Sequence, residues 1–265
     1  FTAFGQTYVN QAASGSNDGT SWENAYTDLS TALANTGTGD IWVAAGTYSG
    51  SYEVITSVDL YGGFAGTEAS IDDRDLTANV TILDGDTNGD DLDGDFNANK
   101  SDNIATLLYV DSLLTEAVVI DGFTFTGAYA DDFLNDEDRE GQGGGIFSYS
   151  SINVANSAFR DNYAYRGGGI RISPAAGGGS NSSISVCSFS NNYSEISPDD
   201  FFAGGAGVYV TNVENFTITG SEFVENTTSN GSLLAAGIIN LVIDNSAFNN
   251  NTSIAGRGAG FRIET

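Results

Sequence analysis

Short runs of alternating apolar and polar residues recur through the second half of the chain. In one run, Ile152 and Val154 fall on one face of a strand and their polar neighbours on the other. A second run places Ile184 and Val186 together in the same way. The pattern recurs in segments 216–219 and 241–243. None of these runs can bury its apolar face alone, so we expect copies of the same unit to cover one another.

The first half of the chain predicts further strands and one helix. Strands are expected over residues 41–45, 54–61, 80–83, 106–110 and 117–125. A helix is expected over residues 16–35, because Thr20 and Glu23 match a capping box and an apolar stripe follows. The stripe consists of Trp22, Ala25, Leu29, Ala32 and Leu33. We expect this helix to cover the first coil, whose bare strand edges would otherwise promote aggregation.

Two short phrases alternate strictly from residue 143 onward. One is a glycine-rich segment before an apolar residue, and its last glycines are Gly145, Gly169, Gly207, Gly237 and Gly260. Their spacings of 24, 38, 30 and 23 residues predict one solenoid coil per copy, with insertions in the longer copies. The other phrase is Phe-x-x-Asn, which ends at Asn162, Asn192, Asn226 and Asn251.

Each phrase has a mechanical reason. The glycines permit positive φ and close approach between the backbones of successive coils. The phenylalanines are expected to point inward and stack on their counterparts one coil away. The asparagines are expected at a corner, where their amides satisfy backbone groups and form a ladder. The chain therefore predicts an all-β fold, a parallel β-helix with a helix at its N-terminal end.

The pairing of the two phrases resembles the polymorphic membrane protein repeat over roughly residues 140–265. The earlier part resembles secreted, right-handed parallel β-helix proteins of bacterial surfaces, which share the pectate-lyase-like architecture. The segments that carry this second resemblance are 8–10, 21–29, 41–48, 61–68, 74–75, 81–85 and 120–127. The resemblance implies a right-handed coil and export to the cell surface or the medium, but no single activity.

The expected organisation has three parts. Residues 1–6 resemble the remnant of a signal peptide, and residues 7–40 form the cap with its amphipathic helix. Residues 41–265 form the β-helix, which we expect to continue beyond residue 265 or to meet a partner there. The location that follows from this reading is extracellular, either secreted or at the cell surface.

Charge narrows the possible partners. The chain carries 35 acidic and 8 basic side chains, a net charge of −27, which disfavours nucleic acid and anionic membranes. Such a surface favours divalent cations, or reflects high salt. No apolar run reaches the length of a transmembrane segment. The one cysteine, Cys187, replaces a serine of the repeat and is expected to be a small buried residue that forms no internal disulfide.

Residues 84–95 contain the sharpest candidate site. They read Asp-x-Asp-x-Asn-Gly and reach an aspartate at the twelfth position, the ligand spacing of EF-hand and dockerin-like calcium loops. The expected Ca²⁺ ligands are Asp84, Asp86, Asn88, Asp90 through its carbonyl, and Asp95. Leu92 at the ninth position and the absence of flanking helices in the pattern keep open the alternative of a solvated acidic loop.

Two functional hypotheses remain open at this stage. The first is an adhesin, passenger or structural rod that contacts carbohydrate or a cell-surface protein through its corner loops, with aromatic platforms. Candidate platform residues are Tyr129, Tyr163, Tyr165, Tyr193, Phe201 and Phe202. The second is a calcium-dependent polysaccharide lyase or another polysaccharide-active enzyme. The chain has no histidine and a single lysine, Lys100, so the sequence nominates no catalytic residue.

Overall fold

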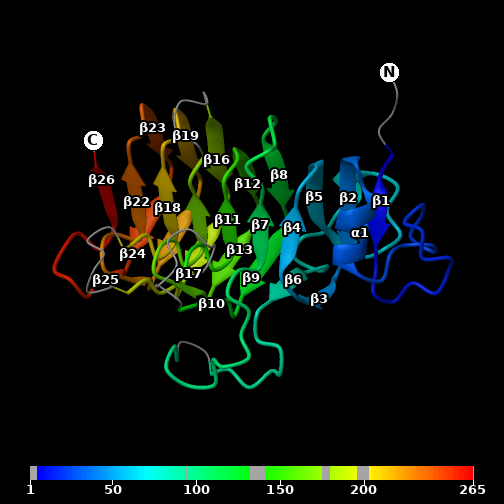
Figure 1. The fold of residues 1–265 in the computed structure, drawn as a ribbon, viewed down its shortest axis with the longest axis horizontal. Helices are drawn as coiled ribbons and strands as arrows, with labels where there is room; N and C mark the ends of the chain where they lie inside the picture. Colours follow the sequence, from blue (N-terminus) through cyan, green and yellow to red (C-terminus); the bar gives the residue numbers. More distant parts are fainter. Residues whose placement is uncertain (1–4, 93–94, 132–140, 175–179, 196–202, 265) are drawn as a thin grey trace.

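The computed structural model describes residues 5–92, 95–131, 141–174, 180–195 and 203–264. Three long parallel sheets run along the molecule, which is an elongated stack of coils (Figure 1). The first sheet contains β1 (Thr7–Val9), β2 (Thr38–Ala44), β5 (Ser57–Phe64), β8 (Val118–Asp121), β12 (Ile152–Ala155), β16 (Asn181–Ser185), β19 (Asn215–Thr219) and β23 (Asn240–Asp244), in that order.

The other two long sheets have seven strands each. The second sheet contains β3 (Gly46–Ser49), β6 (Thr81–Asp84), β9 (Phe123–Thr126), β13 (Ala158–Arg160), β17 (Ser188–Ser190), β20 (Glu222–Val224) and β24 (Ala247–Asn249). The third sheet contains β4 (Tyr52–Val54), β7 (Leu108–Val110), β11 (Ile146–Ser148), β15 (Ile170–Ile172), β18 (Val208–Thr211), β22 (Leu233–Ala236) and β26 (Phe261–Glu264). The chain visits the three sheets in turn and returns to the first one coil further on, so the expected parallel β-helix is confirmed.

Two-stranded sheets mark the corner between the second and third long sheets. One pairs β10 (Tyr129–Ala130) with β14 (Tyr163–Ala164), and the other pairs β21 (Thr227–Thr228) with β25 (Thr252–Ser253). Both pairs follow the Phe-x-x-Asn phrase or its equivalent. This corner therefore extends along several coils as a regular surface.

The phenylalanines of the repeat form the predicted internal stack. Phe125, Phe159, Phe189, Phe223 and Phe248 succeed one another with ring centroids 4.7, 4.9, 4.6 and 4.5 Å apart and nearly parallel planes. The parallel register of their strands places them one above the other. Such offset aromatic contacts add stability beyond the apolar area that they bury.

The asparagine ladder is also confirmed. Asn162 donates through Nδ2 to Asn192 Oδ1 at 3.1 Å, and Asn192 donates to Asn226 Oδ1 at 3.0 Å. Asn226 continues the ladder to Asn251 Oδ1 at 3.0 Å. Each amide also bonds backbone groups of neighbouring coils, as Asn162 does with the Phe125 carbonyl at 3.0 Å. The ladder thus satisfies buried polar groups that the turns would otherwise leave without partners.

Close approach explains the last glycines of the first three glycine-rich segments, Gly145, Gly169 and Gly207. A Cβ added to Gly145 would lie 2.5 Å from the carbonyl oxygen of Gly169 in the next coil, a distance that no side chain tolerates. Gly143 and Gly167, the first glycines of the first two segments, have a different role, because their φ angles are 60° and 75°. Both reasons that the sequence suggested therefore apply, at different positions of the phrase.

The expected helix over residues 16–35 is largely wrong. The helix α1 spans only Leu29–Asn35, and Asp28 is its N-cap through a 2.8 Å bond from Thr31 N. Upstream, short polar side chains bond the local backbone, which competes with helix formation. These bonds include Thr20 N to Asp18 Oδ1, Ser16 N to Asn24 Oδ1 and Thr27 N to Asn17 Oδ1.

The short helix still occupies the expected place. Leu29, Ala32 and Leu33 are buried in the common core, and α1 lies at the N-terminal end of the rod beside β1 and β2 (Figure 1). Trp22, which was expected on the helix, instead packs on Tyr8 with ring centroids 4.8 Å apart. The cap is therefore a helix of two turns together with an irregular segment that carries a tryptophan.

Three strand predictions fail at corners. Segment 54–61 divides into β4 and β5 around the exposed Ile55, and segment 117–125 divides into β8 and β9 at Gly122, whose φ is 82°. Val186 does not share the buried face of Ile184, because it lies at this same kind of corner with a φ of 53° and is 64% exposed. An apolar residue at a corner imitates the alternation of a longer strand.

Cys187 is buried, and its thiol occupies the position of the serines in neighbouring coils, as the repeat predicted. Its Sγ contacts the carbonyl of Ser185 at 3.3 Å, as Ser221 Oγ contacts the carbonyl of Thr219 at 3.0 Å. Burial raises the pKa of this thiol to about 12, so it is not a nucleophile. No helix among the described residues is long and apolar enough to cross a membrane.

Candidate metal centre

The acidic segment between β6 and β7 leaves the rod at the corner between the second and third sheets and returns to it (Figure 1). We call residues 85–104 the acidic loop. Phe96 anchors this loop, because its ring lies 5.2 Å from that of Tyr193 and 6.3 Å from that of Tyr163. Asn103 attaches the returning segment through a 2.6 Å bond to the Gly127 carbonyl.

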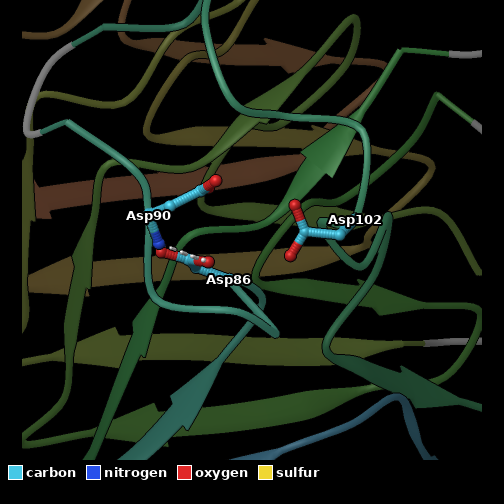
Figure 2. A group of neighbouring side chains, drawn as sticks. All are labelled: Asp86, Asp90 and Asp102. Carbon is cyan, nitrogen blue, oxygen red and sulfur yellow. Dashed lines mark hydrogen bonds between the residues drawn. The ribbon is translucent and has the colours of Figure 1, made fainter.

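Asp86, Asp90 and Asp102 converge within the acidic loop. One carboxylate oxygen of each lies within 4.8 Å of the others. Figure 2 shows that Asp102 comes from the returning segment and points toward the other two. Like charges this close repel one another, although solvent weakens the repulsion at the exposed Asp90. A divalent cation among them would reverse the sign of that interaction.

Backbone donors hold Asp86 in place. Its Oδ1 accepts from Gly89 N at 2.7 Å and its Oδ2 accepts from Asp91 N at 2.9 Å. Partial burial disfavours the charged form, but these N–H donors outweigh it and lower the pKa of Asp86 below its ordinary value. The carboxylate therefore stays ionised, as a metal ligand must.

Asp102 closes the loop from the opposite side. Its Oδ2 accepts from Thr87 Oγ1 at 2.8 Å and from the backbone N of Asn88 at 3.1 Å. Asn99 reinforces the closure by donating to the Asp90 carbonyl at 2.7 Å. The carboxylates are thus positioned by the fold of the loop before any ion enters.

The expected calcium ligands do not all meet. Asp86 and Asp90 belong to the converging group, whereas Asp84 and Asp95 do not. Asp90 joins it through its carboxylate and not through the expected carbonyl, which accepts from Asn99 Nδ2. Asp84 accepts from Asp86 N at 3.1 Å, and burial raises its pKa. Asp95 caps a local turn through a 2.9 Å bond from Asn97 N, and Asn88 Oδ1 accepts from Asp90 N at 3.0 Å.

Sequence spacing missed Asp102. An EF-hand-like pattern looks for its last ligand at the twelfth position, but Asp102 lies at the nineteenth position counted from Asp84. Its approach depends on the return of the loop, which Phe96 and Asn103 fix by contacts with distant coils. The sequence signal for Asp102 was its position as an acidic residue near the end of the loop, and this is a weak signal.

Two side-chain oxygens of the acidic loop are buried without a hydrogen-bond partner among the described residues. Asp91 forms a 2.6 Å ion pair with Lys100 through Oδ2, yet its Oδ1 is buried without a hydrogen-bond partner among the described residues. Asn103 Oδ1 is likewise buried and has no hydrogen-bond partner among the described residues. Asp84, Asp86 and Asp91 share a small polar cavity of about 130 Å³, which Lys100 and Arg160 also line and which does not include Asp90 or Asp102. The fit of a hard cation such as Ca²⁺ therefore depends on the oxygens of Asp86, Asp90 and Asp102 themselves.

The tyrosines proposed as sugar platforms pack on one another. Tyr163 is buried and lies between Tyr129 and Tyr193, with centroid distances of 4.6 and 5.5 Å. Tyr165 contacts Tyr163 edge-on at 5.8 Å. Tyr163 therefore has both ring faces covered, whereas Tyr129, Tyr165 and Tyr193 are only partly buried. Phe201 and Phe202 lie outside the described residues.

No protein-family model, curated protein or solved structure shows significant similarity to this chain.

Proposed function

We propose that this protein is an exported β-helix rod of the cell surface, which presents corner loops to a carbohydrate or protein partner and binds Ca²⁺ in its acidic loop. A solenoid is stiff because each coil is bonded to both neighbours, and loops attached to such a scaffold are well placed for recognition. The observation that carries the calcium part is the convergence of Asp86, Asp90 and Asp102.

In this proposal Ca²⁺ links the outgoing and the returning segments of the acidic loop. Asp86 and Asp90 belong to the outgoing segment and Asp102 to the returning one, so one ion contacts both halves of the loop (Figure 2). Calcium accepts carboxylate and carbonyl oxygens in flexible geometry, which suits a loop without flanking helices. The ion would stiffen this loop, which projects from the rod (Figure 1), and so preserve its binding surface.

Calorimetric titration of the whole chain with Ca²⁺ tests the metal site. We expect saturable binding that weakens at least tenfold in Asp102→Asn, since a ligand that bridges the loop is lost. The matched control is Asp95→Asn, which removes an aspartate of the same loop outside the converging group and should bind like the wild type. Equal loss in both variants would favour the EF-hand spacing, and no heat in the wild type would refute the site.

Glycan arrays and cell-binding assays test the adhesive part. Binding should depend on Ca²⁺ and fall in Asp102→Asn, while the circular dichroism of the β-helix stays unchanged. Calcium binding with no ligand on any array or cell surface would separate the metal site from the adhesive role and refute only the latter.

A polysaccharide-active enzyme is the second candidate, and one pocket favours it. Asp40 on β2 and Asp59 on β5 are register partners in the first sheet and line a cavity of about 330 Å³ together with Glu116. Their strands lie about 4.8 Å apart, so the two side chains emerge next to one another, as the paired carboxyls of a glycosidase do. Burial raises the pKa of both aspartates, and the charge of Asp59 adds to the effect at Asp40.

Turnover assays distinguish the two candidates. Neutral and uronate polysaccharides supplied with Ca²⁺ should remain intact if the protein is a rod or adhesin. Reducing ends that appear with the wild type and disappear with Asp59→Asn would favour hydrolysis at this pocket. Products that absorb in the ultraviolet would instead favour a lyase.

A further inference from the structure

Arg171 lies in the middle of the third sheet, on the outer side of β15. Ile170 and Ile172 beside it are fully buried in the core, so the arginine side chain points the other way. It is nevertheless only 7% exposed. Its register partners are Phe147 on β11 and Tyr209 on β18, and both are buried. A charged group in such aromatic surroundings needs compensation.

The guanidinium of Arg171 is only partly compensated. Its Cζ lies 4.5 Å from the centre of the Tyr209 ring, and its Nη2 is 3.5 Å from Ser173 Oγ, at the limit of a hydrogen bond. Nε and Nη1 are buried and have no acceptor among the described residues. Burial, with a smaller contribution from the charge of Arg166, lowers the pKa of Arg171 to about 10, so the group stays charged at neutral pH.

Several other basic side chains of the chain form ion pairs with carboxylates. Arg74, Lys100 and Arg160 have carboxylate partners at 3.2, 2.6 and 3.4 Å. Arg262, on β26 of the same sheet as Arg171, pairs with Glu264 at 2.5 Å. No carboxylate within the described segments forms an ion pair with Arg171. Of Arg74, Arg160, Arg262 and Arg171, the last is the most deeply buried, and it has no carboxylate partner in the part of the chain that the structure describes.

We propose that Arg171 binds one small monovalent anion, a halide such as chloride or a single carboxylate group, at the outer side of β15. The anion would accept from Nε or Nη1, which the protein leaves without acceptors. The burial of Tyr209 and Phe147 keeps this side of the sheet largely out of contact with solvent.

Size and charge restrict the ligand. Because Arg171 is nearly inaccessible, an extended acidic polymer is too large for the site. A water molecule would satisfy one donor but leave the buried charge unpaired, and in a medium of low polarity the ion pair is the stronger interaction. The net charge of −27 disfavours anion binding in general, so the local positive charge of Arg171 has to outweigh it.

Thermal unfolding of the whole chain at constant ionic strength tests the site. Sodium chloride, bromide or acetate is compared with gluconate, which is too bulky to enter. The wild type should unfold about 2–5 °C higher with the anion that binds, in a saturable manner. A response to chloride and bromide alone assigns a halide, and a response to acetate alone assigns a carboxylate.

Arg171→Met should abolish the dependence on the anion. Arg160→Met is the matched control, because the side chain of Arg160 is 43% exposed, and this variant should respond like the wild type. Equal unfolding temperatures of the wild type in all four salts, or a response that persists in Arg171→Met, would overturn the proposal.

A direct observation keeps the proposal testable if Arg171→Met does not fold. Wild-type crystals grown in bromide should show anomalous density against Nε and Nη1 of Arg171, and crystals grown in acetate should show a planar group there. Density for water alone in both crystals would refute the anion.

Discussion

The buried side-chain amides of single asparagines contribute strongly to the bonding between neighbouring coils. Asn192 is fully buried, donates to the Phe159 carbonyl at 2.9 Å and to Asn226 at 3.0 Å, and accepts from Asn162 N and Nδ2. One side chain therefore serves four polar groups in two neighbouring coils. A buried group that loses its partner costs about 1–3 kcal/mol, so the ladder is sensitive at each position.

Asn192→Ala should lower the free energy of unfolding by at least about 3 kcal/mol, because several buried groups lose partners together. Urea titration followed by tyrosine and tryptophan fluorescence measures the loss. Asn249→Ala is the control, since Asn249 is exposed and makes one 3.3 Å bond to Glu222, so its effect should stay within about 0.5 kcal/mol. Similar losses in the two variants would contradict the ladder's role.

The corner that follows the first sheet contains a strained residue. Gly122, Asn156, Gly220 and Asn245 occupy it in other coils, all with positive φ, and these residue types accept that conformation. Val186 has the same conformation at 53° and is 64% exposed, although its β-branched side chain disfavours it.

Val186→Asn should therefore stabilise the protein by about 1 kcal/mol, through relief of strain. The midpoint of urea unfolding should rise while its slope stays constant. Val242→Asn, at an exposed strand position of β23, should give no such gain. A less stable Val186→Asn would mean that the valine makes a contact worth more than its strain.

At the scale of elements, the short helix closes the N-terminal end of the stack. Leu29 is fully buried in the core, whereas Ser30 beside it is exposed. Without α1 the interior below β2 and β4 would meet water, and a bare sheet end invites pairing with another chain.

Leu29→Asp should cause aggregation, because it places a charge in the core beneath the cap. Ser30→Asp introduces the same charge on the outer face of α1 and should remain monomeric. Light scattering during refolding distinguishes the two variants. A soluble, cooperatively unfolding Leu29→Asp would show that the end of the stack does not depend on this helix.

Features that depend on the repeated sequence pattern could be predicted, whereas features that depend on where the chain returns could not. The Phe-x-x-Asn phrase and the glycine-rich phrase predicted the coil, the ladder and the place of Cys187, because equivalent residues of a repeat contact one another in neighbouring coils. The extent of α1 was overestimated, since bonds from Asp18 and Asn24 to the backbone outweighed an apolar stripe. Asp102 and the pocket at Asp40 were not predicted, because both depend on how separate segments meet.

At the scale of the whole molecule, acidic charge is the dominant property. With 35 acidic and 8 basic side chains, every additional carboxylate experiences repulsion from the rest. The fold responds in two ways. Some carboxylates, such as Asp86, receive backbone N–H donors, and others, such as Asp40, are partly buried beside a like charge. The two groups should respond in opposite directions to acid.

Asp40→Asn should make the protein more stable than the wild type at pH 7. Burial and then the charge of Asp59 raise the pKa of Asp40 in the folded state. The folded protein thus holds this proton more tightly than the unfolded chain, so the contribution of Asp40 to stability is present below about pH 3.9 and is lost as pH rises through the folded pKa. The advantage of the amide should therefore vanish toward pH 3.

Asp86→Asn is the opposite control. The lowered pKa of Asp86 makes its charged form stabilising above pH 3.9, so this variant should be less stable than the wild type at pH 7. Urea midpoints at pH 7, 5 and 3 measure both, and an Asp40→Asn variant less stable at pH 7 would contradict the repulsion between Asp40 and Asp59.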